Sequence, residues 1–211
     1  MQAIIDTKHL TVQTLPPILV LTGEDVGQFE WLKKDILKKI GYDPSDLNYS
    51  YFDMKEASYA EVELDLVSLP FFADEKIVIL DHLLDLTTAK KRNLTDEDLK
   101  QFENYLENPS ESTRLVIFAE GKLDSKRRLV KLLKRDAQII EATTPKEQEV
   151  QRYFASQAQE LGLQFVGDSL DQLLLKSGYD FGELQKNLAL LQAYKEDGQI
   201  TLEDIEEVVP K

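Results

Sequence analysis

The chain has no cysteine and only two histidines among its 211 residues. Without cysteine it can form neither disulfides nor thiolate zinc sites, and it has no cysteine nucleophile. His9 and His82 lie far apart in the sequence and have no other ligand candidates beside them. The sequence therefore predicts no metal site and no cofactor. The lack of cysteine is consistent with a reducing cytosol, and we expect a cytoplasmic protein.

Long apolar runs are absent as well. No run approaches the ~20 apolar residues that a membrane span needs. Residues 1–17 do not show the basic start and long apolar stretch of a signal peptide. We therefore expect no membrane partner.

Positive charge is scarce, with 25 lysines and arginines against 39 aspartates and glutamates and a net charge of -14. Such a chain repels phosphates on average, so DNA contact could come only from a local basic patch. Two segments concentrate cations: Lys90, Lys91 and Arg92, and then Lys122, Lys126, Arg127, Arg128, Lys131, Lys134 and Arg135. They could contact DNA or an acidic partner, through Lys122, Lys126, Arg127 and Arg128 in particular. The alternative, which the sequence alone favours, is a solvated helix face whose last cations complement the helix dipole.

Short apolar runs alternate with helical spacing over the first two thirds of the chain. The runs predicted as strands are residues 18–22, 49–53, 77–81, 115–119 and 137–141. Helices are predicted from about 26 to 40, from 59 to 69, from 95 to 108 and from 126 to 135. This alternation predicts an α/β domain with a parallel five-stranded sheet. Before it, the spacing of Leu10, Val12 and Leu15 suggests an edge strand.

The pattern changes at residues 142–145, and everything after them is predicted to be helical. Four apolar stripes follow at helical spacing, and Gly162, Gly178 and Gly198 separate them. The sequence therefore predicts two domains, an α/β domain over 1–143 and a small all-helical domain over 144–211.

A strand, a glycine and a helix stand at Ile18–Gly23 and beyond, where a P-loop would lie. The P-loop is G-x-x-x-x-G-K-[ST], whose amides, lysine and hydroxyl bind phosphates and magnesium. Counted from Gly23, the positions of the second glycine, the lysine and the hydroxyl are Gln28, Phe29 and Glu30. At the end of strand 77–81, Asp81 stands where an ATPase binds magnesium, but it is followed by histidine. These substitutions argue against ATP hydrolysis.

An α/β domain with a helical lid is also the plan of AAA+ ATPases. In clamp-loader members the lid carries Gly-Asp-(Leu or Met)-Arg, whose arginine touches the γ-phosphate. The corresponding run here is Gly182-Glu183-Leu184-Gln185. Gln185 carries no charge. After the P-loop and the end of strand 77–81, it is the third place where a group that binds nucleotide is missing, although the predicted architecture is that of an AAA+ protein.

Phe71 and Phe72 lie side by side after Pro70 and before strand 77–81. The proline disfavours helix at Leu69, so the two rings occupy a tight connector. Adjacent side chains diverge by ~100° on a helix and ~180° on a strand, so both rings cannot easily face one core. Either both cap the core, which their spacing alone favours because most aromatics are buried, or at least one faces outward to meet a partner.

With these residues in view, the chain resembles the delta subunit of the bacterial DNA polymerase III clamp loader. The resemblance covers nearly the whole chain and rests on the order and spacing of residues 19–25, 69–76, 115–118 with 122–124, and 180–184. It implies an AAA+-like P-loop NTPase fold with a degenerate nucleotide site and a helical lid. It also implies a subunit of a DNA-directed DNA polymerase holoenzyme with no catalytic residues and no intrinsic activity.

The resemblance implies that the chain binds the β sliding clamp and promotes its opening for loading on primed DNA during replication. Phe71 and Phe72 match two consecutive apolar residues that plug a pocket on the clamp, with Leu69 and Pro70 beside them. This implication reverses the preference for buried rings. The family also has a collar domain that joins delta to the gamma/tau and delta prime subunits. Because the chain stops where the collar would begin, we expect it to lack that domain and to reach DNA indirectly.

Two other functions remain open from the sequence. One is a P-loop-like NTPase with non-standard phosphate ligands, and the other is an AAA+-type scaffold in another DNA-maintenance complex. Binding of ATP with magnesium distinguishes the first, and binding of the β clamp distinguishes the second.

Overall fold

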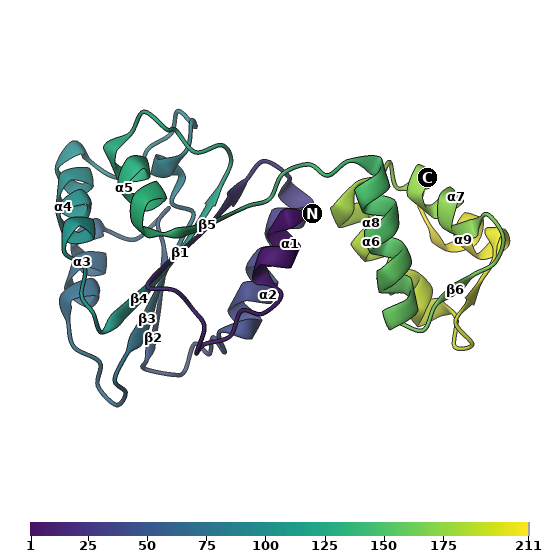
Figure 1. Ribbon diagram of the computed structural model, residues 1–211, viewed down its shortest axis with the longest axis horizontal. Coiled ribbons are helices and arrows are strands. Elements are labelled where there is room, and N and C mark those ends of the chain that lie inside the picture. Colours follow the sequence, from purple (N-terminus) through teal and green to yellow (C-terminus); the bar gives the residue numbers. More distant parts are fainter. Residues whose placement is uncertain (211) are drawn as a thin grey trace. The chain divides into compact units, whose positions relative to one another are not determined.

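The computed structural model describes residues 1–210, and these form two compact units. One unit comprises residues 2–143, and the other begins at Thr144 and includes Met1. In Figure 1 the first unit runs from purple to green and the second from green to yellow.

The first unit is built on the parallel five-stranded sheet that the sequence predicts. The strand order is β2-β3-β4-β1-β5, which leaves β2 and β5 at the edges. The central strand pair is in register from Ile18 opposite Leu115 to Gly23 opposite Glu120. The strands are β1 (Ile18–Gly23), β2 (Tyr49–Asp53), β3 (Lys76–Asp81), β4 (Thr113–Glu120) and β5 (Gln138–Glu141).

Helices cover both faces of this sheet, because successive strand residues point to opposite sides. Val20 and Ile117 belong to the core under α3, α4 and α5, whereas Leu21 and Phe118 belong to the core under α1 and α2. The helices of this unit are α1 (Gln2–Thr7), α2 (Val26–Lys39), α3 (Tyr59–Val67), α4 (Asp96–Glu107) and α5 (Arg128–Asp136), with a 3-10 turn at Leu84–Leu86. Both faces of the inner strands are therefore buried, as a parallel sheet requires.

The prediction of an edge strand before residue 18 is wrong. Residues 2–7 form α1, and the segment after it turns where Thr11 and Thr14 exchange backbone-to-side-chain hydrogen bonds of 2.8 and 3.2 Å. Leu10 and Leu15 are buried beside α2, while Val12 is exposed. The apolar residues therefore anchor a turn against the core and do not alternate along a strand.

The second unit contains the four helices that the sequence predicts: α6 (Glu147–Glu160), α7 (Ser169–Lys176), α8 (Phe181–Tyr194) and α9 (Leu202–Val208). It is not purely helical, however, and this part of the prediction needs correction. Two short strands, β6 (Gln164–Phe165) and β7 (Gln199–Ile200), pair in parallel. Gly198 allows this pairing, because a Cβ there would lie 2.4 Å from the carbonyl oxygen of Gly162.

Candidate functional site

The connector between α3 and β3 presents an apolar surface to solvent. Phe71 and Phe72 are each 79% exposed and Leu69 is 77% exposed. The centroids of the two phenyl rings lie 6.3 Å apart, so the rings contact each other and not the core. The interpretation in which both rings cap the core is therefore wrong. Leu69, Pro70, Phe71 and Phe72 together are called the aromatic knob below.

The amino-terminal side of the knob is anchored by a buried lysine. The ammonium group of Lys76 donates to three acceptors: the carbonyl oxygen of Asp65, its carboxylate oxygen at 3.1 Å and the hydroxyl of Ser68 at 2.7 Å. An ammonium group has three donors, so all of them are used. Lys76 is only 5% exposed and thereby ties the start of β3 to the end of α3.

The carboxyl-terminal side of the knob is anchored by an ion pair. Arg114 donates from Nε and Nη2 to the two carboxylate oxygens of Glu75, at 2.6 and 3.1 Å. Its Nη1 also donates to the carbonyl oxygen of Leu15. The hydrogen bond from Arg114 holds the pKa of Glu75 below its ordinary value of 4.5. Both ends of the connector are therefore fixed while the rings between them are free to meet a partner.

The segment that corresponds to the P-loop is short and filled by the chain itself. Gly23 exchanges backbone hydrogen bonds with Gly121, and a Cβ on Gly23 would lie 2.2 Å from the carbonyl oxygen of Ala142. Helix α2 begins three residues later, and the amide of Gln28, in its first turn, donates to the carboxylate of Asp25 at 2.9 Å. Three amide donors of this segment, those of Gly23, Asp25 and Gln28, are thus used internally.

Of the other side chains at the corresponding nucleotide positions, those of Gln28 and Phe29 are buried within the α/β unit. Gln28 is buried and its side-chain amide donates to the carbonyl oxygen of Thr143 at 3.0 Å. Phe29 belongs to the buried side of α2 and packs in the core, and Glu30 is exposed. Gln185 is half-buried on α8, in the other unit.

Asp81 is buried at the end of β3 and engaged through both carboxylate oxygens. Its Oδ2 lies 2.5 Å from Nζ of Lys33 and accepts from the hydroxyl of Tyr51, while Oδ1 accepts from the backbone amide of His82 at 2.8 Å. Burial and the hydrogen bond to Asp81 raise the pKa of Tyr51 far above 10. Sequence reasoning missed Lys33, although it follows Phe29 and Leu32 on the buried side of α2.

The basic segment following β4 is divided between paired and unpaired side chains. Arg127 pairs with Asp124 at 3.2 Å and Arg128 pairs with Glu107 at 3.0 Å. Lys122 and Lys126 are exposed and form no ion pair among the described residues. Across residues 1–210 no group of three or more metal-ligating side chains is arranged to hold an ion, and no helix has the length and apolarity to cross a bilayer.

A parallel sheet with the strand order β2-β3-β4-β1-β5, followed by a small and mostly helical unit, defines an AAA+-like fold. Solved structures agree: the Bacillus subtilis DNA clamp loader delta protein matches with a TM-score of 0.67 and 23% identity over 99% of this chain and 61% of its own. RuvB from Thermotoga maritima matches with a TM-score of 0.56 and 10% identity over 99% of this chain and 68% of its own. These similarities establish the fold.

The sequence comparisons define the particular family. The family model for the DNA polymerase III delta subunit matches residues 19–143. A curated relative, DNA polymerase III subunit delta of Bacillus subtilis, is 27% identical over 210 residues, which are 97% of this chain and 60% of that protein. The chain belongs to the delta-subunit family of DNA polymerase III, and it spans about 60% of the length of these relatives.

Proposed function

We propose that this chain binds the β sliding clamp through the aromatic knob and promotes opening of the ring. The observation that carries the proposal is the exposure of two adjacent phenyl rings on a connector anchored at both ends. An exposed apolar patch of this kind is a solubility risk unless a partner covers it. A rigid aromatic side chain that enters a preformed pocket is a typical hot spot, whose truncation costs ~2 kcal/mol or more.

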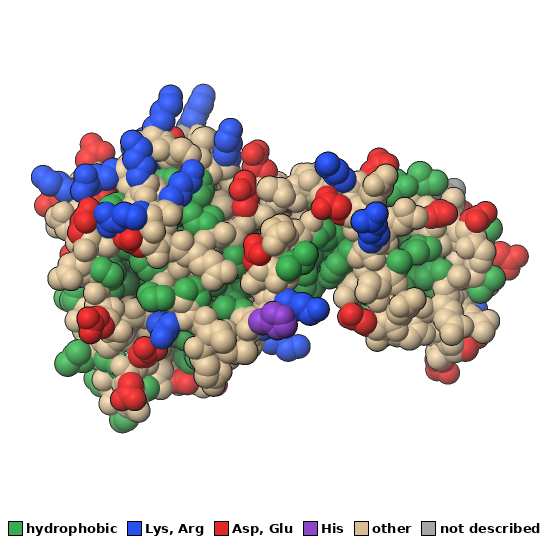
Figure 2. All heavy atoms as spheres, viewed as in Figure 1, with side chains coloured by type: hydrophobic (Ala, Val, Ile, Leu, Met, Phe, Trp, Pro, Cys, Tyr) green, Lys and Arg blue, Asp and Glu red, His purple; other side chains and the backbone are tan. Residues whose placement is uncertain are grey.

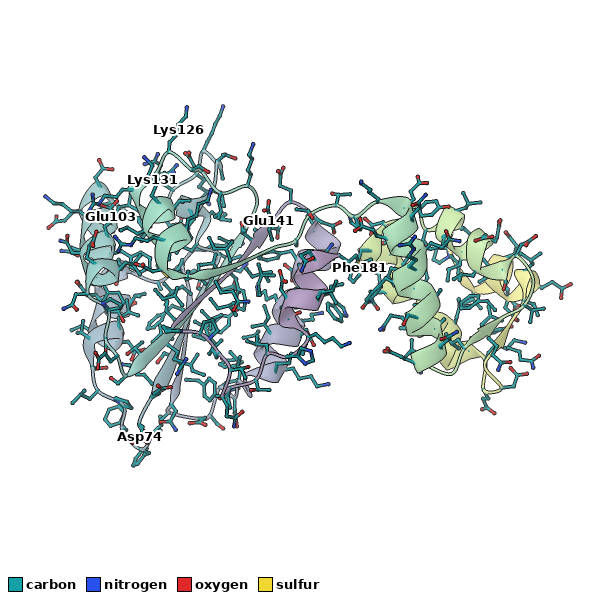
Figure 3. All side chains as sticks on the ribbon, in the orientation of Figure 1. Asp74, Glu103, Lys126, Lys131, Glu141 and Phe181 are labelled. Carbon is teal, nitrogen blue, oxygen red and sulfur yellow. The ribbon has the colours of Figure 1, made fainter. Side chains whose placement is uncertain are left out.

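Anchoring makes the knob suited to this role, because little conformational entropy is lost when an ordered loop binds. Lys76 fixes one end and the Glu75–Arg114 pair fixes the other. The rings are thereby presented at the amino-terminal edge of the sheet. Figure 3 labels Asp74, which directly follows the knob, at the lower tip of the α/β unit.

For ring opening we propose a population shift. The knob binds a conformation of one clamp interface that the closed ring seldom adopts, and it favours opening only by its difference in affinity for the two states. No bond chemistry is required of this chain. The other clamp-loader subunits, gamma/tau and delta prime, are further proposed partners.

We further propose that the chain does not bind or hydrolyse ATP. The filled space beside Gly23, the capped amide of Gln28 and the Lys33–Asp81 pair support this proposal. A phosphate would have to displace the carboxylate of Asp25, and a magnesium ion would have to displace the ammonium of Lys33.

The test is calorimetric titration of the chain with purified β clamp, and separately with ATP and magnesium. The proposal predicts saturable binding of the clamp and no binding of the nucleotide. If the clamp does not bind, the clamp assignment is overturned. The alternative function, an AAA+-type scaffold in another DNA-maintenance complex, is then favoured. Tight nucleotide binding or turnover would instead support a P-loop-like NTPase with non-standard phosphate ligands.

A further inference from the structure

A cavity of about 200 Å³ opens beside the aromatic knob, at the amino-terminal edge of the sheet. Its wall includes Ala73 and Glu75, which closely follow Phe72, so the cavity and the knob belong to one surface. The cavity is called the side pocket below. The rest of its wall comes from the turn before β1, the loop before β2 and the starts of three strands: Val12, Asp46, Asn48, Tyr49, Ile77 and Arg114.

The side pocket has the size of a single side chain. Pockets for drug-sized ligands measure about 300–1,000 Å³, so this cavity is smaller than a typical small-molecule site. Apolar residues form much of its wall, with Ile77 buried and Val12 exposed. An extended side chain of a partner protein can therefore enter it and pack along apolar atoms.

The polar groups of the side pocket leave acceptors, not donors, without partners. Arg114 donates to both carboxylate oxygens of Glu75, and the hydroxyl of Tyr49 donates to a backbone carbonyl oxygen at 2.6 Å. Asp46 accepts from the amide of Asn48 at 2.8 Å through Oδ1, but it forms no ion pair within residues 1–210. The side-chain carbonyl oxygen of Asn48 is buried and has no hydrogen-bond partner in the same range.

Negative charge also surrounds the knob itself. Lys76 and Arg114, the two cations that contact the connector, are neutralised by Asp65 and Glu75. Three nearby carboxylates are exposed and form no ion pair within the described part of the chain: Asp43, Asp74 and Glu111. Figure 2 shows red side chains beside green ones at the lower tip of the α/β unit, where Figure 3 labels Asp74. A partner surface that complements this edge brings positive charge.

We propose that the side pocket receives a lysine or arginine side chain of the protein that binds the aromatic knob. The inference rests on the proposed function, and it adds a contact in which the partner inserts a side chain in return. The apolar stem of such a side chain packs along Val12 and Tyr49, while its charged head reaches Asp46. A hydrogen bond between a cation and a carboxylate is about twice as strong as one between neutral groups.

Other kinds of side chain fit the side pocket less well. A purely apolar side chain would cover the carboxylate of Asp46 without a counter-charge, which is unfavourable for a charge removed from water. An acidic side chain would meet Asp46 with charge of the same sign. A cation with an apolar stem satisfies both the wall and the carboxylate, so charge complementarity selects it.

The experiment is surface plasmon resonance with immobilised β clamp and the full chain in solution. The first test variant is Asp46→Asn, which removes the charge but keeps an oxygen that can accept from the amide of Asn48. The second is Val12→Trp, which fills the side pocket without a change in charge. Glu111→Gln and Ile5→Trp are the matched controls, at exposed residues that do not line the side pocket. Circular dichroism verifies that all variants are folded.

We expect Asp46→Asn to weaken clamp binding about tenfold, mainly by faster dissociation, because loss of a partner from an enclosed charge pair acts on the dissociation rate. Val12→Trp should weaken binding by a similar factor. The two controls should dissociate at the wild-type rate. Glu111→Gln, as a change at the rim, should alter at most the association rate.

The outcomes separate this inference from the proposed function. If Phe71→Ala/Phe72→Ala weakens clamp binding but Asp46→Asn and Val12→Trp dissociate at the wild-type rate, the side pocket is not a contact and the knob is. If Asp46→Asn changes only the association rate, its carboxylate acts at a distance, and the inserted cation is likewise refuted. If the wild-type chain does not bind the clamp, or the knob variant binds as the wild type does, the proposed function fails and this inference fails with it.

Discussion

Lys33 and Asp81 form an ion pair between α2 and the end of β3, with Nζ 2.5 Å from Oδ2. The pair stands where an ATPase of this fold needs a free carboxylate for magnesium. Asp81 is 3% exposed, so its carboxylate contacts this partner and the hydroxyl of Tyr51 in place of solvent. What corresponds to a catalytic position is here a structural contact between a helix and the sheet.

Replacing Asp81 by asparagine should destabilise the α/β unit by ~3 kcal/mol, because it leaves the ammonium of Lys33 largely buried without its counter-charge. Urea unfolding measures the change. Glu107→Gln, which removes the exposed ion pairs with Arg128 and Arg135, is the control and should cost less than ~1 kcal/mol. If both changes lower the free energy of unfolding equally, the Lys33–Asp81 pair does not stabilise the unit more than an exposed ion pair does.

Gly23→Ala should destabilise the unit by more than ~3 kcal/mol. The added methyl group would meet the carbonyl oxygen of Ala142 at 2.2 Å, and the φ of +127° is strained for any other residue. The matched change is Gly41→Ala, where φ is +70° and the nearest atom is the hydroxyl of Tyr49 at 3.4 Å. It should cost only ~1 kcal/mol. Thermal unfolding measures the loss of stability in each variant. Wild-type stability in Gly23→Ala would contradict the close packing of Ala142 against Gly23.

Lys76→Met should weaken clamp binding as well as stability, because it frees the connector from the end of α3. Asp65 and Ser68 are then left without the donor that they share. Limited proteolysis should cut the chain within residues 68–75 faster than in the wild type, since a loosened loop enters a protease more readily. The control is Lys55→Met at an exposed lysine. An unchanged cleavage rate would mean that Lys76 does not anchor the knob.

The Glu75–Arg114 pair gives a specific pH dependence. The folded-state pKa of Glu75 lies below its ordinary value of 4.5, so the pair stabilises the fold above pH 4.5. That contribution is lost as the pH falls through the lowered pKa, because the carboxyl group takes up a proton. The difference in stability between wild type and Glu75→Gln should be constant above pH 4.5 and vanish in more acidic solution. A difference that persists at low pH would contradict the assignment.

Periodicity of apolar residues was sufficient to predict the five strands of the sheet and most of the helices. Strands such as 18–22 are buried on both faces and helices such as 26–40 have one apolar side, and both patterns are local. Residues 1–17 misled the prediction because Leu10 and Leu15 are buried in a turn, where no period applies. The pair β6–β7 was missed because two-residue strands have no period either.

The candidate site depended more on contacts between distant segments. The exposure of Phe71 and Phe72 could not be derived from their spacing, which favours burial, and it was predicted only through the resemblance. Lys76 and Arg114 bind residues 11 and 39 positions away, and no local pattern announces such partners. For the basic segments, the charges are visible in the sequence, but the carboxylates that neutralise three of the arginines are not.

The central claim is that the aromatic knob is the contact with the β clamp. The most direct measurement is the affinity of Phe71→Ala/Phe72→Ala for the clamp, beside Ile5→Ala/Leu175→Ala, which removes two other exposed apolar side chains. We predict unchanged stability in the first variant, since its rings are outside the core, and a weakening of binding by at least ~2 kcal/mol. The control should bind as the wild type does. Wild-type affinity in the Phe71→Ala/Phe72→Ala variant would contradict the account.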